Sequence, residues 1–273
     1  MNVAAQIRQS LEHQSTPLWW PGLAEVLVAE RRVDLPFDLA LYSTSRFLRD
    51  IDPVRDLTVR SLIESDSLVL RLESVHPSIA SHFDNRGLNF IASSEINADT
   101  VQTVSSAISK ISLLPSLAQT VGELARSVHL LKVSDPGYDV SFSDPTIPFS
   151  IFVSIPAGPA AALRLAEAII HESMHLQLSL IEEKISLVRN DSAKLYSPWK
   201  KERRPLSGII HALYVFRVID EWLCGIAMQE SLQEYIVRRR AQIAAEILQI
   251  ELGDEIDNLA TDGRKLLMRL RPF

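Results

Sequence analysis

One segment constrains the fold more than any other: the stretch from Ala160 to about Val188, which is rich in Ala, Leu, Ile and Glu. These residues favour a helix. The preceding Ala157-Gly158-Pro159 breaks a strand, and proline suits the first position of a helix. Between Leu165 and Ile170 the only charge is Glu167, so the sequence predicts a helix that is largely buried.

This helix carries an HExxH motif, His171-Glu172-Ser173-Met174-His175. Helical residues four apart lie about 40° apart around the axis and about 6 Å apart along it. Both imidazoles therefore project to one side, where they can hold one metal ion. Glu172 lies about 100° around the axis from His171. We expect it to bind metal-bound water, to act as a general base, or to orient a ligand. The alternative is two structural histidines that match the motif by chance.

Two histidines do not complete a metal site, so a third ligand is expected. The extended motif of metzincins requires Gly at position 178 and His at position 181, and the chain has Leu178 and Ile181. A gluzincin needs a glutamate on a following helix, for which Glu221 is the nearest candidate. His211 is the better candidate, because it lies near the start of the next apolar helix on its inward face. A core histidine is the alternative reading of His211.

The remaining pattern predicts a mainly α fold with a small β element, an α+β fold with a helical N-terminal part. Two short strands are expected before the HExxH helix, at Val140–Phe142 and Ser150–Ile155, with an edge strand next to the helix as in zinc metalloproteases. Ser65–Phe83 reads either as a strand or as a helix broken at Pro77. Other helices are expected at Ala4–His13, Pro21–Arg31, Leu39–Asp50, Asp99–Leu131 (bent or split at Pro115), Ser207–Gln229, Gln233–Leu252 and Glu255–Leu270.

The length of 273 residues allows one large domain or two small ones. Near residue 130 the sequence changes from segments with helical spacing to a proline-rich stretch. This change suggests a helical N-terminal region, 1–130, as a candidate substrate-binding part. Residues 131–273 then form the metal-binding catalytic region. A single domain that contains both regions is the alternative.

Composition excludes several classes of protein. The net charge of −6 argues against nucleic acid as a partner. The single cysteine, Cys224, excludes an intramolecular disulfide framework and a cysteine zinc ribbon, which fits a cytoplasmic protein. The N-terminus has no apolar run of signal-peptide length. The longest charge-free stretch, Pro145 to Leu163, contains four prolines, so no membrane segment is expected.

The residues after the motif resemble a specific family, the HExxH-type 2-oxoglutarate-dependent peptide β-hydroxylases. These domains act in the biosynthesis of ribosomally made peptide natural products. The resemblance spans about residues 150 to 230 and departs at Ala212, where many members have glycine. It rests on His171–His175, Tyr196, Pro198-Trp199, Arg204-Pro205-Leu206-Ser207-Gly208, and His211 with Tyr214 and Phe216.

The resemblance implies Fe(II) as the metal, 2-oxoglutarate as cosubstrate and a precursor peptide as substrate. His171, His175 and His211 would bind the iron, and imidazole ligands suit that metal. The distal carboxylate of 2-oxoglutarate needs a cation, for which Arg204 is the first choice and Arg203 and Arg217 are reserves. Ser207 would add a hydroxyl donor, and Tyr196 with Trp199 would wall the pocket. A zinc-dependent HExxH metallopeptidase and a non-catalytic peptide-binding module remain the alternatives.

Overall fold

A computed structural model gives the fold as two units, Met1–Leu27 with Gln177–Phe273 (unit 1) and Val28–Leu176 (unit 2). The division does not fall near residue 130, and the domain boundary expected there stays a prediction. The expected helix at Leu39–Asp50 lies outside the described residues. The structure describes residues 2–13, 15–29, 59–65, 67–75, 80, 83, 88–133, 139–145, 147, 149–228 and 232–271.

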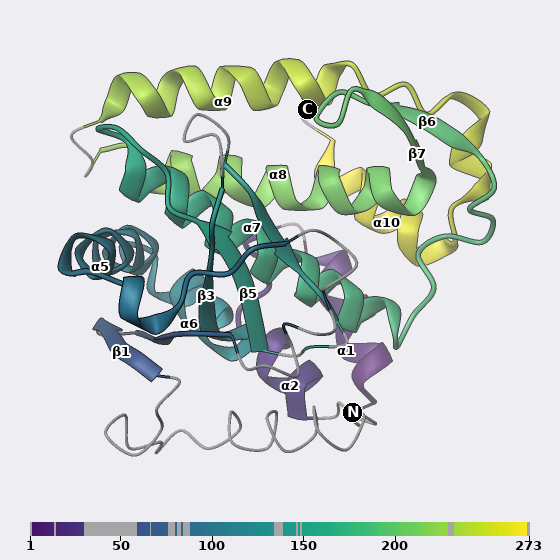
Figure 1. Ribbon diagram of the computed structural model, residues 1–273. Helices are drawn as coiled ribbons and strands as arrows, with labels where there is room; N and C mark the ends of the chain where they lie inside the picture. Colours follow the sequence, from purple (N-terminus) through teal and green to yellow (C-terminus); the bar gives the residue numbers. More distant parts are fainter. Residues whose placement is uncertain are drawn as a thin grey trace. The chain divides into compact units, whose positions relative to one another are not determined.

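Unit 2 is built on a five-stranded sheet in the order β1-β2-β3-β5-β4. The strands are β1 (Val59–Ser65), β2 (Leu68–Glu73), β3 (Ala125–Leu131), β4 (Ser141–Ser143) and β5 (Phe149–Ser154). The inner strands β2, β3 and β5 are parallel, whereas β1 and β4 pair antiparallel with their neighbours. Figure 1 shows β3 and β5 side by side at the centre of the sheet. The two strands expected before the HExxH helix are confirmed as β4 and β5.

Two helices connect the parallel strands β2 and β3, as parallel pairing requires a crossover. They are α5 (Ala98–Ser112) and α6 (Pro115–Leu124). The expected split at Pro115 is confirmed, because that proline occupies the first turn of α6, where its missing N–H costs nothing. The side chain of Asn97 caps α5 by accepting a hydrogen bond from the N–H of Thr100 at 2.9 Å. A 3-10 turn, η2 (Ser93–Glu95), precedes α5.

The helix expected to continue to Leu131 is wrong in its last part, because β3 begins at Ala125. Leu124, Val128 and Leu131 continue the helical spacing of α6 into β3, so periodicity alone does not separate the strand from the helix. Pairing with β2 on one side and β5 on the other fixes this segment as a strand. Within Ser65–Phe83 the strand reading is confirmed by β2.

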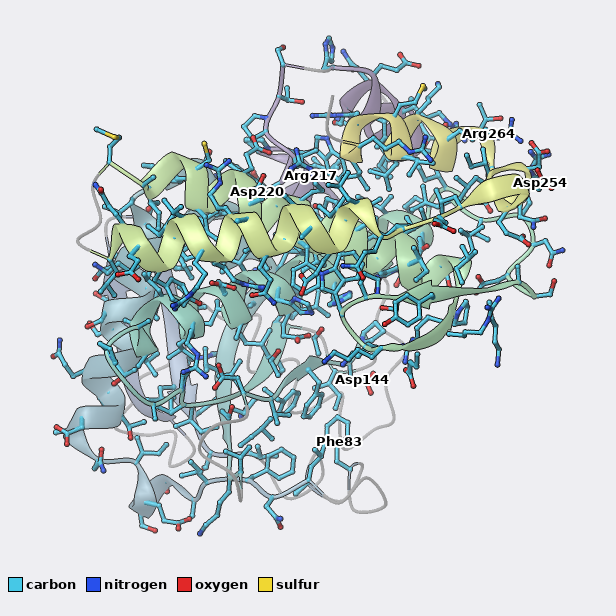
Figure 2. All side chains as sticks on the ribbon, turned by 90° about the horizontal axis from the view of Figure 1, so that it is seen from above. Phe83, Asp144, Arg217, Asp220, Asp254 and Arg264 are labelled. Atoms are coloured by element: carbon cyan, nitrogen blue, oxygen red, sulfur yellow. The ribbon has the colours of Figure 1, made fainter. Side chains whose placement is uncertain are left out.

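The core of unit 2 lies on both faces of this sheet. All six residues of β5 are buried, as expected for a strand that is covered on both sides. Phe152 of β5 packs against Phe83, Phe90 and Phe142, with ring centroids 4.4–5.9 Å away. Figure 2 labels Phe83 in this aromatic cluster. Deletion of so large a buried ring would leave a cavity, so the cluster stabilises the sheet beside β4.

Unit 1 is mainly helical, and its central helix α8 (Leu206–Ile226) is apolar on most of its surface. Helix α9 (Gln233–Leu248) lies beside α8 (Figure 1). Asp220 of α8 accepts hydrogen bonds from Arg217 and from Arg240 of α9, both at 2.8 Å, and Figure 2 labels Arg217 and Asp220. The other elements of unit 1 are α1 (Val3–Glu12), the start of α2 (Leu23–Ala29), β6 (Lys194–Ser197), β7 (Glu202–Pro205), η3 (Gly253–Asn258) and α10 (Thr261–Leu270).

The HExxH helix, α7 (Ala161–Glu182), ends six residues before the expected end. Beyond Glu182 the chain is held to the C-terminal segment instead of continuing the helix. The C=O of Leu187 accepts from the N–H of Ala260 at 2.9 Å, and the N–H of Arg189 donates to the C=O of Asn258 at 2.7 Å. These tertiary hydrogen bonds override the helix propensity of the segment.

The predicted class, mainly α with a small β element, is confirmed, although β1 and β3 of the sheet and the separate β6–β7 hairpin were not expected. Across the described residues, no helix has both the length and the apolar composition needed to span a membrane.

Candidate metal centre

The two motif histidines face each other from successive turns of α7. Their Nε2 atoms lie 3.1 Å apart, and their ring centroids 4.7 Å apart. Two nitrogens that bind one ion at about 2.1 Å are about 3.0–3.4 Å apart for bond angles between 90° and the tetrahedral value. The side chain of His171 keeps 25% of its surface exposed. The donor pair therefore fits a shared metal ion that solvent or substrate can reach.

Glu172 lies beside this pair and is fixed by strand β4. Its carboxylate accepts hydrogen bonds from Ser141 Oγ at 2.6 Å and from Ser143 Oγ at 2.8 Å. The residue is only 3% exposed, and its Oε1 lies 4.0 Å from Nε2 of His171. A carboxylate at this distance can contact a ligand bound between the histidines, a role typical of groups just outside a metal's direct ligands.

His211, the expected third ligand, lies on α8 and contacts Glu182. Its Nε2 is 2.8 Å from Oε2 of Glu182. Metal-binding histidines commonly donate their second ring N–H to a carboxylate. Glu182 is thus the partner expected of a histidine that binds metal through Nδ1.

The third ligand stays a prediction, because His211 belongs to unit 1 and the pair belongs to unit 2. Among the residues that the structure describes, no three His, Cys, Asp or Glu side chains come together closely enough to share an ion. The histidine pair is therefore the part of the predicted ligand set that the geometry supports directly.

The expected anchors of 2-oxoglutarate lie around the β6–β7 hairpin and the first turn of α8. Arg204 Nη1 donates to Glu202 Oε1 at 3.0 Å, on the surface. The backbone N–H and the hydroxyl of Ser207 donate to Asp191, at 2.8 and 2.6 Å. Arg204 and Ser207 thus each donate to a carboxylate of the protein. If 2-oxoglutarate bound to them, its distal carboxylate would take the place of Glu202 or Asp191 as the acceptor.

The other residues expected near the cosubstrate have different surroundings. Tyr196 is 47% exposed. Trp199 packs instead on Phe216 of α8, with ring centroids 4.7 Å apart and planes 13° apart. Of the reserve arginines, Arg203 donates to the C=O of Lys194, and the other is paired with Asp220 as described above.

A pocket of about 430 Å³ follows the end of α7. It is lined by residues 182–188 and by Asp191, so the carboxylates that bind His211 and Ser207 both border it. Its lining includes three acidic side chains, Glu182, Glu183 and Asp191, and one lysine, Lys184. This excess of negative charge suits a cationic ligand better than the dianion 2-oxoglutarate.

Glu221, the alternative glutamate ligand, faces the N-terminal segment of unit 1. Its Oε2 accepts a hydrogen bond from the N–H of Leu18 at 3.1 Å. Burial raises the pKa of Glu221, and the opposing effects of the Leu18 hydrogen bond, Arg217 and Arg269 are smaller. In this structure the carboxylate therefore serves to hold the N-terminal segment.

The raised pKa predicts how stability responds to pH. A group whose folded pKa is raised contributes stability below its unfolded pKa and loses it as pH rises through the folded pKa. Glu221→Gln keeps an acceptor for Leu18 and removes the buried charge. We expect the free energy of unfolding of Glu221→Gln, relative to the wild type, to increase between pH 4 and pH 7 in urea titrations.

The matched control is Glu12→Gln, because Lys265 lowers the pKa of the exposed Glu12. For Glu12→Gln, the free energy of unfolding relative to the wild type should decrease between pH 4 and pH 7. A difference between Glu221→Gln and wild type that is the same at both pH values would contradict the assignment.

Two functional candidates, Ser141 and Ser143, were not expected from the sequence. Their signal is the Ser-Phe-Ser alternation of a short strand, which places both hydroxyls on one face. The residue that this face contacts, Glu172, lies about thirty positions later in the chain. The spacing of residues along the sequence does not reveal such a contact.

No family model matches the chain, and no curated protein matches it significantly.

Proposed function

We propose that this protein is an Fe(II)- and 2-oxoglutarate-dependent oxygenase that hydroxylates a β-carbon in a ribosomally made precursor peptide. The observation that carries the proposal is the pair of Nε2 atoms of His171 and His175, 3.1 Å apart beside a buried glutamate. The resemblance between residues 150 and 230 adds the choice of iron and of the cosubstrate. The proposed reaction takes place in the cytoplasm, where such peptides are made.

In the proposed site His171 and His175 hold the iron, and His211 completes the ligand set with Glu182 as its hydrogen-bond partner. Arg204 and Ser207 bind the distal carboxylate of 2-oxoglutarate, and Tyr196 borders it. When bound, iron and 2-oxoglutarate supply oxidation by O₂. Overall, 2-oxoglutarate, O₂ and a C–H bond give succinate, CO₂ and a C–OH group, which balances atoms and electrons.

The outer edge of β4 supports a peptide as the substrate. The C=O of Val140 accepts from the N–H of Ser154 on β5 at 2.8 Å, so the backbone groups of Val140 face inward. Because these groups alternate in direction along an antiparallel strand, those of Ser141 and Ser143 point away from β5. An extended peptide can add to such an edge through main-chain hydrogen bonds.

The contacts of Glu172 suit a positioning role in the proposed oxygenase. Each carboxylate oxygen accepts a serine hydroxyl, which holds the side chain against β4. Each oxygen keeps a second lone pair, so in a zinc peptidase the same carboxylate would take a proton from metal-bound water.

The alternative function is that of a zinc-dependent metallopeptidase. The same β4 edge beside the same helix favours it, because a peptidase also binds an extended chain next to its metal. Zinc also accepts two histidines and a third His or Glu as ligands. Glu172 would then be the general base.

The test is turnover of 2-oxoglutarate by the full chain. Protein reconstituted anaerobically with Fe(II) and 2-oxoglutarate, with peptides encoded next to its gene, is expected to release succinate only when O₂ is admitted. Zn(II) in place of Fe(II) should give none. Absence of oxygen-dependent succinate with Fe(II) and every such peptide would refute the oxygenase.

A further inference from the structure

We propose that Ser141 and Ser143 are positioning residues, which hold the Glu172 carboxylate in place next to the metal-binding histidines. The inference rests on the metal-binding part of the proposed function. It does not depend on the oxygenase chemistry. No part of the HExxH pattern points to these two residues, which lie on a different element.

The geometry gives each carboxylate oxygen its own donor. Ser141 Oγ donates to Oε1 at 2.6 Å, and Ser143 Oγ donates to Oε2 at 2.8 Å. Ser143 Oγ also lies 3.3 Å from the backbone C=O of Glu172. Two donors on two oxygens fix the rotation of the carboxylate plane as well as its position. Ser141 and Ser143 reach it together because residues two apart share a face of the strand.

The energetics explain why two hydroxyls are needed. A carboxylate that is only 3% exposed loses most of its hydration, and this is costly unless hydrogen bonds replace water. Hydrogen bonds from hydroxyls to a charged oxygen are among the stronger ones in proteins. Without them, Glu172 would gain by rotating toward solvent and away from the face that bears His171.

The position of β4 extends this role to the substrate. The side chains of Ser141 and Ser143 hold Glu172, while their backbone groups face away from β5, on the outer side of the last strand among the described residues. A peptide bound at that edge would contact the same two residues that set the orientation of Glu172. The strand thus links the proposed peptide edge to the metal-binding helix.

The test is the affinity of the full-length chain for Co(II), measured by its absorption spectrum. Removing a group that hydrogen-bonds to a metal ligand typically lowers affinity about 10–100-fold. Ser141 and Ser143 act one step further out, through Glu172, so for the Ser141→Ala, Ser143→Ala double variant we expect a loss at the lower end of this range, about 10-fold. Ser141→Thr and Ser143→Thr keep the hydroxyl and should stay within about threefold of the wild type. Ser127→Ala, on β3, is the matched control and should bind as the wild type does, because Ser127 is buried but does not bond Glu172.

A Glu172→Ala background separates positioning from a general effect on folding. If the serines act through Glu172, removing them in that background should change the Co(II) affinity less than about twofold. The proposal is overturned if the double variant binds Co(II) like the wild type, or if its loss is the same without Glu172. If the double variant does not unfold cooperatively, the Co(II) affinities of Ser141→Ala and of Ser143→Ala are compared in the same way, with and without Glu172.

The outcome is independent of the oxygenase proposal, because Co(II) binding requires neither 2-oxoglutarate nor O₂. A chain that binds Co(II) through these residues but releases no succinate would refute the oxygenase and leave the positioning role standing.

Discussion

Replacing His171 or His175 with alanine is expected to lower the affinity of this protein for Fe(II), Co(II) and Zn(II) by more than about 100-fold. Loss of a mere outer partner of a metal ligand costs about 10–100-fold, and a direct ligand contributes more. The expectation follows from the two Nε2 atoms 3.1 Å apart, a distance that one shared ion would set. Isothermal titration calorimetry or competition with a chelating dye measures the change.

The matched control is His13→Ala, because His13 is exposed at the end of α1 and far from the motif in sequence. It should bind metal like the wild type. His211→Ala tests the third ligand separately and should also weaken binding. Unchanged affinity in both His171→Ala and His175→Ala would contradict a metal centre on α7. Unchanged affinity in His211→Ala alone would overturn only the third ligand.

Gly263→Ala is expected to destabilise unit 1 by about 3 kcal/mol. A Cβ added at Gly263 of α10 would lie 2.0 Å from the backbone oxygen of Leu187. That oxygen cannot move aside cheaply, since it accepts the hydrogen bond from Ala260 that holds the segment after α7. Overpacking of this kind costs about 1–3 kcal/mol, and loss of the hydrogen bond adds about 1 kcal/mol. Urea unfolding monitored by circular dichroism measures it.

Gly208→Ala is the control for this prediction, because the nearest atom to its added Cβ is 3.7 Å away, an ordinary contact. Gly208 lies in α8, where alanine is the better helix former, so this variant should be as stable as the wild type or more stable by about 0.5 kcal/mol. Equal stability of Gly263→Ala and the wild type would show that α10 does not pack against Leu187.

The sequence predicted those elements whose determinants are local. The HExxH helix follows from composition, although it begins at Ala161 and not at Pro159, and the facing of His171 and His175 follows from helical spacing alone. The strands β4 and β5 were recognisable because a Pro-rich loop joins them and Ala157-Gly158-Pro159 ends the second. By contrast, β3 was read as helix, because only its pairing with β2 and β5 distinguishes it from the end of α6.

The site divides in the same way. Its metal-binding pair and Glu172 could be named from five consecutive residues, whereas the partners of that glutamate could not. Ser141 and Ser143 come close only through the packing of β4 on α7, which is a tertiary contact. The carboxylate partners of the two proposed 2-oxoglutarate anchors, Glu202 and Asp191, were likewise hidden in loop and hairpin geometry.

The most direct test of the proposed oxygenase traces the oxygen atom in its product. Each short peptide encoded beside the gene would be incubated with the Fe(II)-loaded protein and 2-oxoglutarate under oxygen-18 gas and examined by mass spectrometry. The account predicts an intact peptide that carries one oxygen-18 atom on a side chain. A cleaved peptide whose new carboxylate takes its oxygen from water would contradict it and would identify a metallopeptidase.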